Sequence, residues 1–206
     1  MQTVNDRITF TFGTIAMTFF GYSVLALLLM HLLRPDYSPV NHMISDYGVG
    51  QYGWIMSTAF VAMGIGLLTL VIGLFRGGPR STPARIGTIL LAIASIGLVI
   101  SAIFPTDLLP PSTRTGRIHT MSFLVNVISI MLAAILLSVS FGSQPRWRPF
   151  QRTAAVLASL IVIAFILQFL TLHRGMPYGL TNRFFVIVLF AWMFAISIRL
   201  RLLARA

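Results

Sequence analysis

The segment FTFGTIAMTFFGYSVLALLLMHLL, residues 10–33, contains no Asp, Glu, Lys or Arg. An apolar run of about 20 residues is long enough to cross a lipid bilayer as a helix. The run ends at Arg34-Pro35-Asp36, because Pro35 cannot continue the helix. It is too long for the core of a signal peptide and lacks a small-residue cleavage site. The segment therefore predicts a retained transmembrane helix.

Five further apolar runs follow, separated by loops rich in proline, glycine and arginine. No internal repeat is evident along the chain. We expect one transmembrane domain over residues 1–206, an all-α bundle of membrane-spanning helices at about residues 10–33, 52–75, 85–104, 118–141, 153–172 and 184–203.

Composition supports this class of protein. Of the 206 residues, 57% are hydrophobic and only 9% are charged, and the mean hydropathy is +0.89, whereas a soluble domain has roughly one-quarter charged residues. The absence of cysteine excludes disulfides, iron–sulfur clusters and thiol catalysis. The net charge of +11 comes from arginines that flank the apolar runs. Because no basic stripe or base-stacking module accompanies them, nucleic-acid binding is not expected.

The arginines also predict the orientation of the chain. An even number of spans places both termini on one side of the membrane, and the loops on that side carry more arginine. By the positive-inside rule, both termini are cytoplasmic. We also expect a multi-pass protein of the cell (inner) membrane. The inner arginines are Arg7, Arg76, Arg80, Arg85, Arg146, Arg148, Arg152, Arg199, Arg201 and Arg205, and the outer ones are Arg34, Arg114, Arg117, Arg174 and Arg183.

Four polar passages fall on the outer side in this topology: residues 41–54 (NHMISDYGVGQYGW), 104–107, 116–119 and 173–183. We expect them to meet in one outward-facing pocket. The candidate ligand-binding residues are His42, Ser45, Asp46, Asp107, Arg117, His119, Ser122, Asn126, His173, Asn182 and Arg183.

The fourth predicted span carries a polar stripe. His119, Ser122, Asn126 and Ser129 are spaced three, four and three residues apart, which places them on one helix face. Asn126 lies about 10 Å deeper than His119 at the rise of an α-helix. A polar amide at that depth faces protein or water rather than lipid. The stripe is either a seam of interhelical hydrogen bonds or the wall of a cavity with His119 at its outer end.

A metal site is an alternative use of the same residues. Catalytic zinc is held by three ligands and keeps a fourth position open for water. His42 and Asp46 are four residues apart and would share a face if they lay on a helix, but the chain has no HExxH motif. No cofactor is therefore expected, and zinc is the alternative, with candidate ligands His42, Asp46, Asp107, His119 and His173.

The outer arginines offer a different role. An arginine binds phosphate through two parallel hydrogen bonds. With Arg117, Arg174 and Arg183 at its mouth, an apolar pocket would suit a phospholipid or an isoprenoid phosphate. Alternatively, Arg183 forms a structural ion pair with Asp46 or Asp107. Because Asp46 and Arg183 stand at inner helix ends, we also expect them to matter more than Asp36 and Arg34.

Three of these passages resemble a known family. The Asn41-x-x-Ile44-Ser45-Asp46-x-Gly48 passage, the Phe104-Pro105-x-Asp107 passage and His119 resemble domain-of-unknown-function family 998 over most of the chain. That family consists of bacterial and archaeal six-helix membrane proteins without a settled reaction, so the resemblance implies a fold and a site position. The Ile-Ser-Asp-x-Gly element is also similar to the eukaryotic family of the damage-regulated autophagy modulator, although Tyr47 replaces the expected threonine.

Three functions are compatible with these features. In the first, the outward pocket binds a lipid or other amphiphile, and the protein acts in envelope lipid handling or as an accessory subunit. The second is a membrane-embedded, metal-dependent hydrolase with His and Asp ligands. The third is a small transporter, although no repeat or broken mid-membrane helix is evident. Membrane lipids are the expected partners, and a protein partner or a homo-oligomer remains open.

Overall fold

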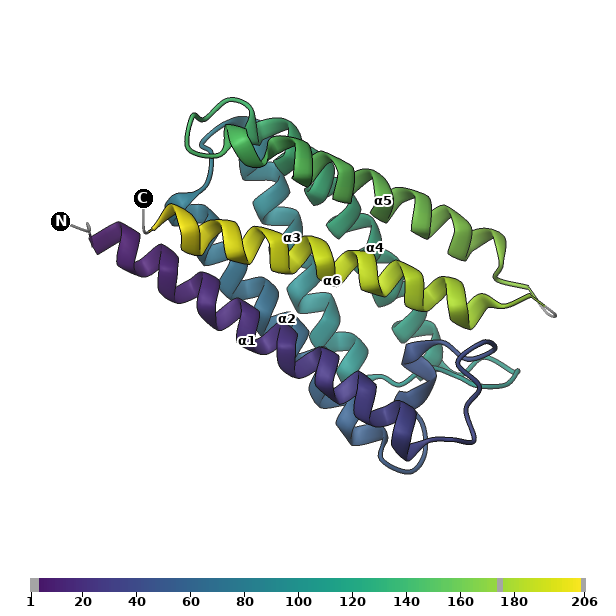
Figure 1. Cartoon of the computed structure of the whole chain (residues 1–206). Coiled ribbons are helices and arrows are strands. Elements are labelled where there is room, and N and C mark those ends of the chain that lie inside the picture. The colour runs from purple at the N-terminus through teal and green to yellow at the C-terminus, as the bar shows by residue number, and fades with distance from the viewer. Residues whose placement is uncertain (1–3, 174–175, 205–206) are drawn as a thin grey trace.

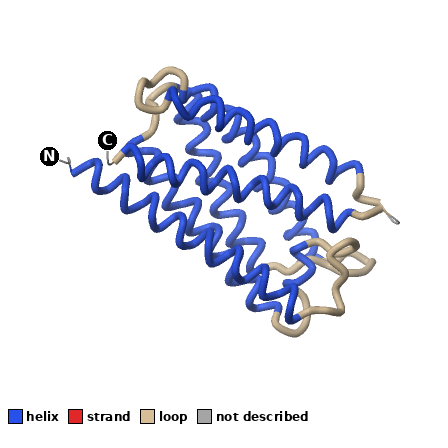
Figure 2. The backbone as a smooth tube through the Cα atoms, in the orientation of Figure 1, coloured by secondary structure: helices blue, strands red, loops and turns tan. Residues whose placement is uncertain are grey.

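The computed structural model describes residues 4–173 and 176–204. Arg174 and Arg205, which contribute to the predicted charge asymmetry, lie outside these residues. The described part contains only helices and connecting loops (Figures 1 and 2). The elements are α1 (Val4–Leu33), η1 (Ile44–Gly48), α2 (Gly53–Gly77), α3 (Thr82–Ile103), α4 (Arg114–Phe141), η2 (Arg148–Phe150), α5 (Gln151–Leu170) and α6 (Tyr178–Leu203), where η marks a short 3-10 helix.

The long helices have the length and composition of membrane spans. Within the described residues, six helices contain windows with a mean hydropathy between 1.9 and 2.5, sufficient to cross a bilayer. The predicted all-α class is confirmed, and the chain is a multi-pass membrane protein. Large apolar side chains such as Leu32, Phe75 and Leu109 lie on the surface, each with an exposed fraction of 79%. This pattern is typical of a protein that is surrounded by lipid.

The helices are arranged as a ring. Each long helix packs against the next one in the sequence, and α6 packs against α1 to close the ring. Helix α6 also contacts α2 across the ring. Both termini lie at one end of the bundle (Figure 1). The opposite end, here called the distal end, is formed by residues 34–52, 104–113, 171–173 and 176–177. Which end faces the cytoplasm remains a prediction from the arginine distribution.

Five of the long helices begin earlier than the predicted spans; among them, α4 begins at Arg114 rather than at residue 118, and α6 begins at Tyr178 rather than at residue 184. The Thr113 hydroxyl accepts a hydrogen bond from the Gly116 N–H at 3.1 Å and caps α4. Pro177 stands immediately before α6. Arg117 and Arg183 are consequently helical residues, although the sequence places them in the loops.

Aromatic packing joins the helices near the middle of the bundle. Phe20 of α1 is fully buried and makes edge-on contacts with Phe190 and Phe194 of α6, at centroid distances of 6.5 and 5.9 Å. It also lies against Gly66 of α2, where an added Cβ would be 2.5 Å from the Phe20 ring. The small residue therefore lets α1, α2 and α6 meet closely, as helix contacts in lipid require.

Candidate ligand-binding site

A pocket of about 640 Å³ opens within the ring at its distal end, a volume within the usual range for ligand pockets. Helices α2, α3, α4 and α6 supply its walls, and the distal loops supply its rim. The lining residues are His42, Met43, Ile44, Ser45, Asp46, Phe60, Met63, Leu98, Ser101, Thr106, Asp107, Leu108, Leu109, His119, Thr120, Phe123, Leu124, Asn126, Val127, Ile130, Leu172, Tyr178, Asn182, Phe185, Val186 and Leu189.

Most of the pocket wall is apolar. Each of the four helices contributes aliphatic or aromatic side chains, and the deeper of these, including Val127, Ile130 and Leu189, are buried. Two leucines at the rim are exposed, Leu109 at 79% and Leu172 at 45%. The interior therefore offers a hydrocarbon surface, and the opening is apolar along part of its edge.

Residues 42–46 contribute His42, Ser45 and Asp46 to the polar part of the wall, and two of the hydrogen bonds that hold this segment involve Asn182 and Asp46. The Ile44 N–H donates to Asn182 Oδ1 of α6 at 3.0 Å. The Met43 N–H donates to Asp46 Oδ2 at 2.9 Å, which fixes the carboxylate at the start of η1. Burial raises the pKa of Asp46, against the opposing effects of the Met43 N–H and of the positive charges nearby. The partly buried carboxyl group of Asp46 is thus harder to ionise than an exposed aspartate.

His119 occupies the outer end of the polar stripe on α4. It is 5% exposed, and its Nδ1 lies 2.8 Å from the Phe104 carbonyl oxygen. A carbonyl oxygen only accepts hydrogen bonds, so Nδ1 carries a proton. In the neutral ring, Nε2 then has a free lone pair, and no described residue bonds to it. The ring packs edge-on against Phe60 at a centroid distance of 6.1 Å, which fixes its orientation in the pocket wall.

Arg183 ties the distal loop to the bundle. Its Nε donates to His31 Nε2 of α1 at 2.9 Å, and its Nη2 donates to the buried Tyr47 hydroxyl at 3.1 Å. His31 can accept this bond because its Nδ1 donates to the Leu27 carbonyl oxygen at 2.7 Å. Nη1 donates to the carbonyl oxygens of Pro39, His42 and Gly179 at 2.8, 2.6 and 3.0 Å.

Gly179 makes this loop attachment sterically feasible. The Gly179 N–H donates to the Val40 carbonyl oxygen at 2.8 Å. A Cβ at Gly179 would lie only 2.5 to 2.7 Å from the carbonyl oxygens of Pro39, His42 and Val40. These oxygens approach the N-terminus of α6, where the helix dipole favours negative charge. The loop that forms the pocket rim is therefore held by the first two turns of α6.

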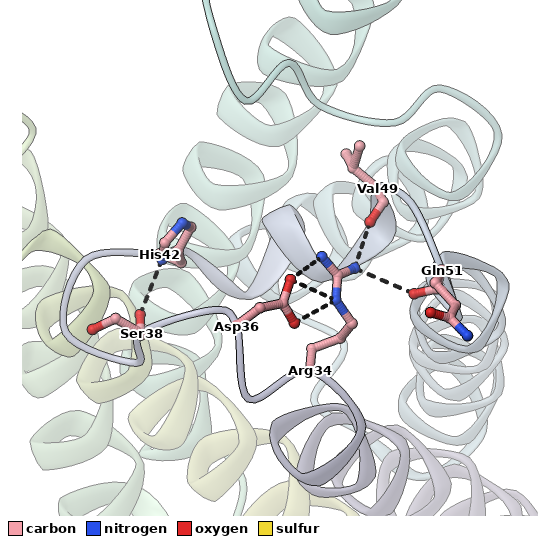
Figure 3. Close-up of polar contacts among 6 residues, drawn as sticks. All are labelled: Arg34, Asp36, Ser38, His42, Val49 and Gln51. Carbon is pink, nitrogen blue, oxygen red and sulfur yellow. Dashed lines mark hydrogen bonds and ion pairs between the residues drawn. The ribbon is translucent and has the colours of Figure 1, made fainter.

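Arg34 holds the other side of the same loop, and its importance relative to Arg183 stays a prediction. Figure 3 shows its guanidinium between Asp36 and two backbone carbonyls. It forms an ion pair with Asp36 at 2.7 Å and donates to the carbonyl oxygens of Val49 and Gln51 at 2.7 and 3.2 Å. It also lies 3.8 Å above the Tyr37 ring, which stacks on His42 at 4.7 Å. The Arg-Pro-Asp spacing after an apolar run could have indicated this pair.

The polar stripe on α4 combines both of its predicted roles. Ser122 donates to the Gly97 carbonyl oxygen of α3 at 2.6 Å and accepts from Ser101 at 3.1 Å. Asn126 Nδ2 lies 3.5 Å from Ser101 Oγ. Ser122 therefore belongs to an interhelical seam, whereas His119 and Asn126 also line the pocket. Asn126 Oδ1 is buried without a hydrogen-bond partner and abuts Gly97, where an added Cβ would overlap it.

The structure brings together most of the candidate residues, but not the arginines. Asp107 lines the pocket, and its carboxylate accepts from the Thr113 N–H and hydroxyl at 2.7 and 2.8 Å. His173 is exposed outside the pocket, and Arg117 faces another groove between α3 and α4. Arg183 donates hydrogen bonds to the carbonyl oxygens of the loop and does not line the pocket. The sequence-predicted residues that line the pocket are His42, Ser45, Asp46, Asp107, His119, Asn126 and Asn182.

Two arrangements expected from the sequence, an ion pair of Arg183 and a shared helix face for His42 and Asp46, are not found among the described residues. Arg183 forms its bonds with neutral acceptors, and the described residues contain no ion pair between it and Asp46 or Asp107. His42 precedes η1, so it and Asp46 do not share an α-helical face. Among the described residues, no three His, Asp, Glu or Cys side chains gather closely enough to hold a metal ion. This geometry gives the zinc alternative no support.

Comparison with known proteins identifies a family. The family described as "Protein of unknown function (DUF998)" matches residues 15–199, a range that includes most of α1, the pocket loops and nearly all of α6. Neither a curated protein nor a solved structure matches the chain. The matched range contains every residue of the pocket. Because the match covers most of the 206 residues, the chain belongs to the DUF998 family.

Proposed function

We propose that the pocket binds one membrane amphiphile, with its hydrocarbon part between α2, α3, α4 and α6 and its polar end at residues 42–46. The observation that carries this proposal is the composition of the pocket wall, which is polar around Asp46 and His119 and mostly apolar below them, with Asn126 and Ser101 as the deeper polar residues. A cavity of this volume with a few convergent polar groups is typical of small-molecule sites.

The charged side chains of the pocket wall favour a ligand whose polar end is uncharged. No arginine is among the described lining residues, whereas the carboxyl groups of Asp46 and Asp107 are. An anionic phosphate would lie near these carboxyl groups without a guanidinium to pair with it. A hydroxyl or amide group could instead donate to His119 Nε2 and exchange hydrogen bonds with Ser45 or Asp46. We therefore infer a neutral, hydrogen-bonding head group rather than the phosphate considered from the sequence.

In this proposal the protein works in the bacterial inner membrane with its pocket facing outward, in envelope lipid handling or as an accessory subunit of a larger assembly. The exposed leucines at the rim support exchange of an amphiphile with the surrounding bilayer, because hydrocarbon can pass over them without contacting water.

Mass spectrometry of lipids that copurify with the protein tests the proposal. Val127→Trp fills the apolar body, and Leu124→Trp fills the pocket from a position that is 36% exposed and tolerates a larger side chain more readily. Ile166→Trp on α5, at a position that is 51% exposed and outside the pocket, serves as the control. We expect a neutral amphiphile at about one copy per chain in the wild type and the control, and its loss from both filled variants. An unchanged lipid content in folded Leu124→Trp would refute the proposal.

A further inference from the structure

The distal end has a second arginine arrangement that the pocket does not use. Of the described arginines at this end, Arg34 and Arg183 are fully engaged with the loop of residues 34–52. Arg114 and Arg117 differ from them: both are exposed, and among the described residues neither guanidinium has a hydrogen-bond or ion-pair partner. They lie three residues apart in the first turn of α4, close enough for both to reach one small anion.

These two arginines stand at the end of an apolar groove of about 490 Å³ on the outer surface of the ring. Helix α3 contributes one side and α4 the other. Several of the wall residues are exposed to the surroundings of the bundle, including Ile96 at 63% and Met121 at 62%. The groove is lined by Ile93, Ile96, Gly97, Ile100, Arg114, Arg117, Ile118, Met121, Ser122 and Val125.

The groove runs in the direction of a lipid chain. It starts at the distal membrane surface, where the arginines lie, and continues toward the bilayer centre as far as Val125. Val125 is about 12 Å below Arg117 at the rise of an α-helix. Its apolar part is therefore within the hydrocarbon layer, whereas the guanidinium groups are at the level of the phospholipid head groups.

We propose that this groove is a binding site for an anionic phospholipid of the distal leaflet. The phosphate is held by Arg114 and Arg117, and one acyl chain lies between α3 and α4. Charge complementarity selects this occupant, because two guanidinium groups that no described residue pairs with match a phosphate that carries no compensating cation. The site is distinct from the pocket inside the ring, whose described lining residues include the carboxyl groups of Asp46 and Asp107 and no arginine.

The absence of cysteine from the sequence allows a local test. A bimane fluorophore is attached to Val125→Cys in the groove or to Ile187→Cys, a lipid-facing control on α6 that is 65% exposed. Each labelled protein is reconstituted in phosphatidylcholine vesicles that contain a minor fraction of phosphatidylglycerol or phosphatidylcholine with brominated acyl chains, which quench bimane on contact.

We expect brominated phosphatidylglycerol to quench the Val125 probe at about fivefold to tenfold lower lipid fraction than brominated phosphatidylcholine, the gain from two charge-assisted contacts near the surface. At Ile187 the two lipids should quench alike. Arg114→Gln/Arg117→Gln should remove the preference at Val125 and leave quenching at Ile187 unchanged, which also shows that the variant is folded.

Two results would overturn the proposal. One is a preference for phosphatidylglycerol that persists in Arg114→Gln/Arg117→Gln. The other is equal quenching by both lipids at Val125 in the wild type. If that equal quenching is also much weaker than at Ile187, the groove is covered by protein, such as a second copy of the chain, rather than by lipid.

Discussion

At the residue scale, two side chains of the pocket wall, His119 and Asp46, each have one polar atom hydrogen-bonded to the backbone. His119 is the clearest case, because its bond to the Phe104 carbonyl oxygen determines which ring nitrogen carries the proton. Asp46 is similar, since one carboxylate oxygen is committed to the Met43 N–H. Each residue uses one atom for the fold and leaves another for a ligand.

His119→Asn separates these two functions. The asparagine amide can take the place of Nδ1 and donate to the Phe104 carbonyl oxygen, but it has no atom at the position of Nε2. We expect the fold to be retained and the affinity for the copurifying amphiphile to fall about tenfold, the value of one hydrogen bond of about 1.4 kcal/mol. Lipid titration followed by native mass spectrometry measures the affinity. Unchanged binding would show that Nε2 does not contact the ligand.

Asp46 should give the protein a pH-dependent stability. Its pKa is raised by burial, so the folded state holds the proton more tightly than the unfolded state. Stability then falls as the pH rises from the titration range of an unfolded aspartate through the raised pKa of folded Asp46, and it stays low above that range. Asp46→Asn keeps an acceptor for the Met43 N–H and cannot ionise, so its melting temperature relative to wild type should increase over this pH range.

Asp36→Asn is the matched control for this experiment. The hydrogen bond from Arg34 lowers the pKa of Asp36, so ionisation of this carboxyl favours the folded state. The contribution is present above the titration range of an unfolded aspartate and is lost as the pH falls through the lowered pKa. Relative to wild type, the melting temperature of this variant should decrease with rising pH, opposite to Asp46→Asn. Parallel pH profiles for the two variants would contradict both assignments.

At the element scale, α6 and α4 organise the distal end in different ways. Helix α6 binds the loop of residues 34–52 through Gly179, Asn182 and Arg183, which occupy its first two turns. Helix α4 instead has side chains in three environments. His119 and Asn126 line the pocket, Ser122 bonds to α3, and Val125 faces the outer groove.

Arg183→Lys tests the attachment of the loop to α6. A lysine carries the same charge but cannot reach the five acceptors that the guanidinium bonds on α1, η1, α6 and the loop. We expect a loss of about 1–3 kcal/mol of stability and a lower melting temperature in detergent. Arg117→Lys, at an exposed position without a protein partner, should change stability by less than about 0.5 kcal/mol. Equal melting temperatures would show that the loop is held by other contacts.

Single cysteines on α4 test the assignment of its faces. Cysteine at His119 or Asn126 should react with a small polar thiol reagent added from the distal side, because both positions line the pocket. Cysteine at Ser122 should react at least about tenfold more slowly, since this side chain is buried against α3, and cysteine at Val125 or Ile128 should be protected by lipid. Reaction at His119 without reaction at Asn126 would limit water access to the pocket mouth.

At the scale of the whole molecule, the ring of helices places both termini at one end and the pocket at the other (Figure 1). The side of the membrane on which the pocket opens therefore follows from the location of either terminus.

Reporter fusions to the C-terminus determine the orientation. We expect a cytoplasmic reporter to be active and a periplasmic reporter to be inactive, because the loops at the termini carry more arginine than the distal loops. Fusions that end in the loop of residues 142–147 should give the same result, whereas fusions within residues 108–112 should give the opposite one. A periplasmic C-terminus would place the pocket on the cytoplasmic side.

The sequence by itself determined the fold class, the approximate spans and the passages that meet at the distal end. It did so because an apolar run must cross the bilayer as a helix, and because short loops return the chain to the same surface. The direction of individual side chains was decided only by the tertiary structure. Arg183 and Arg117 look alike in the sequence, yet the guanidinium of Arg183 is enclosed by loop carbonyls and Arg117 is exposed beside a groove.

The reason is that the bonding of a buried polar group depends on the neighbours that the packed helices bring to it. Local periodicity placed His119, Ser122 and Asn126 on one face of α4, but α3 and α2 divide that face between a hydrogen-bonded seam and the pocket. Likewise, the spacing of His42 and Asp46 suggested a shared helix face, whereas His42 closes a turn by donating its N–H to the Ser38 carbonyl oxygen and stands before η1. Contacts between residues far apart in the sequence therefore decided which side chains a ligand can reach.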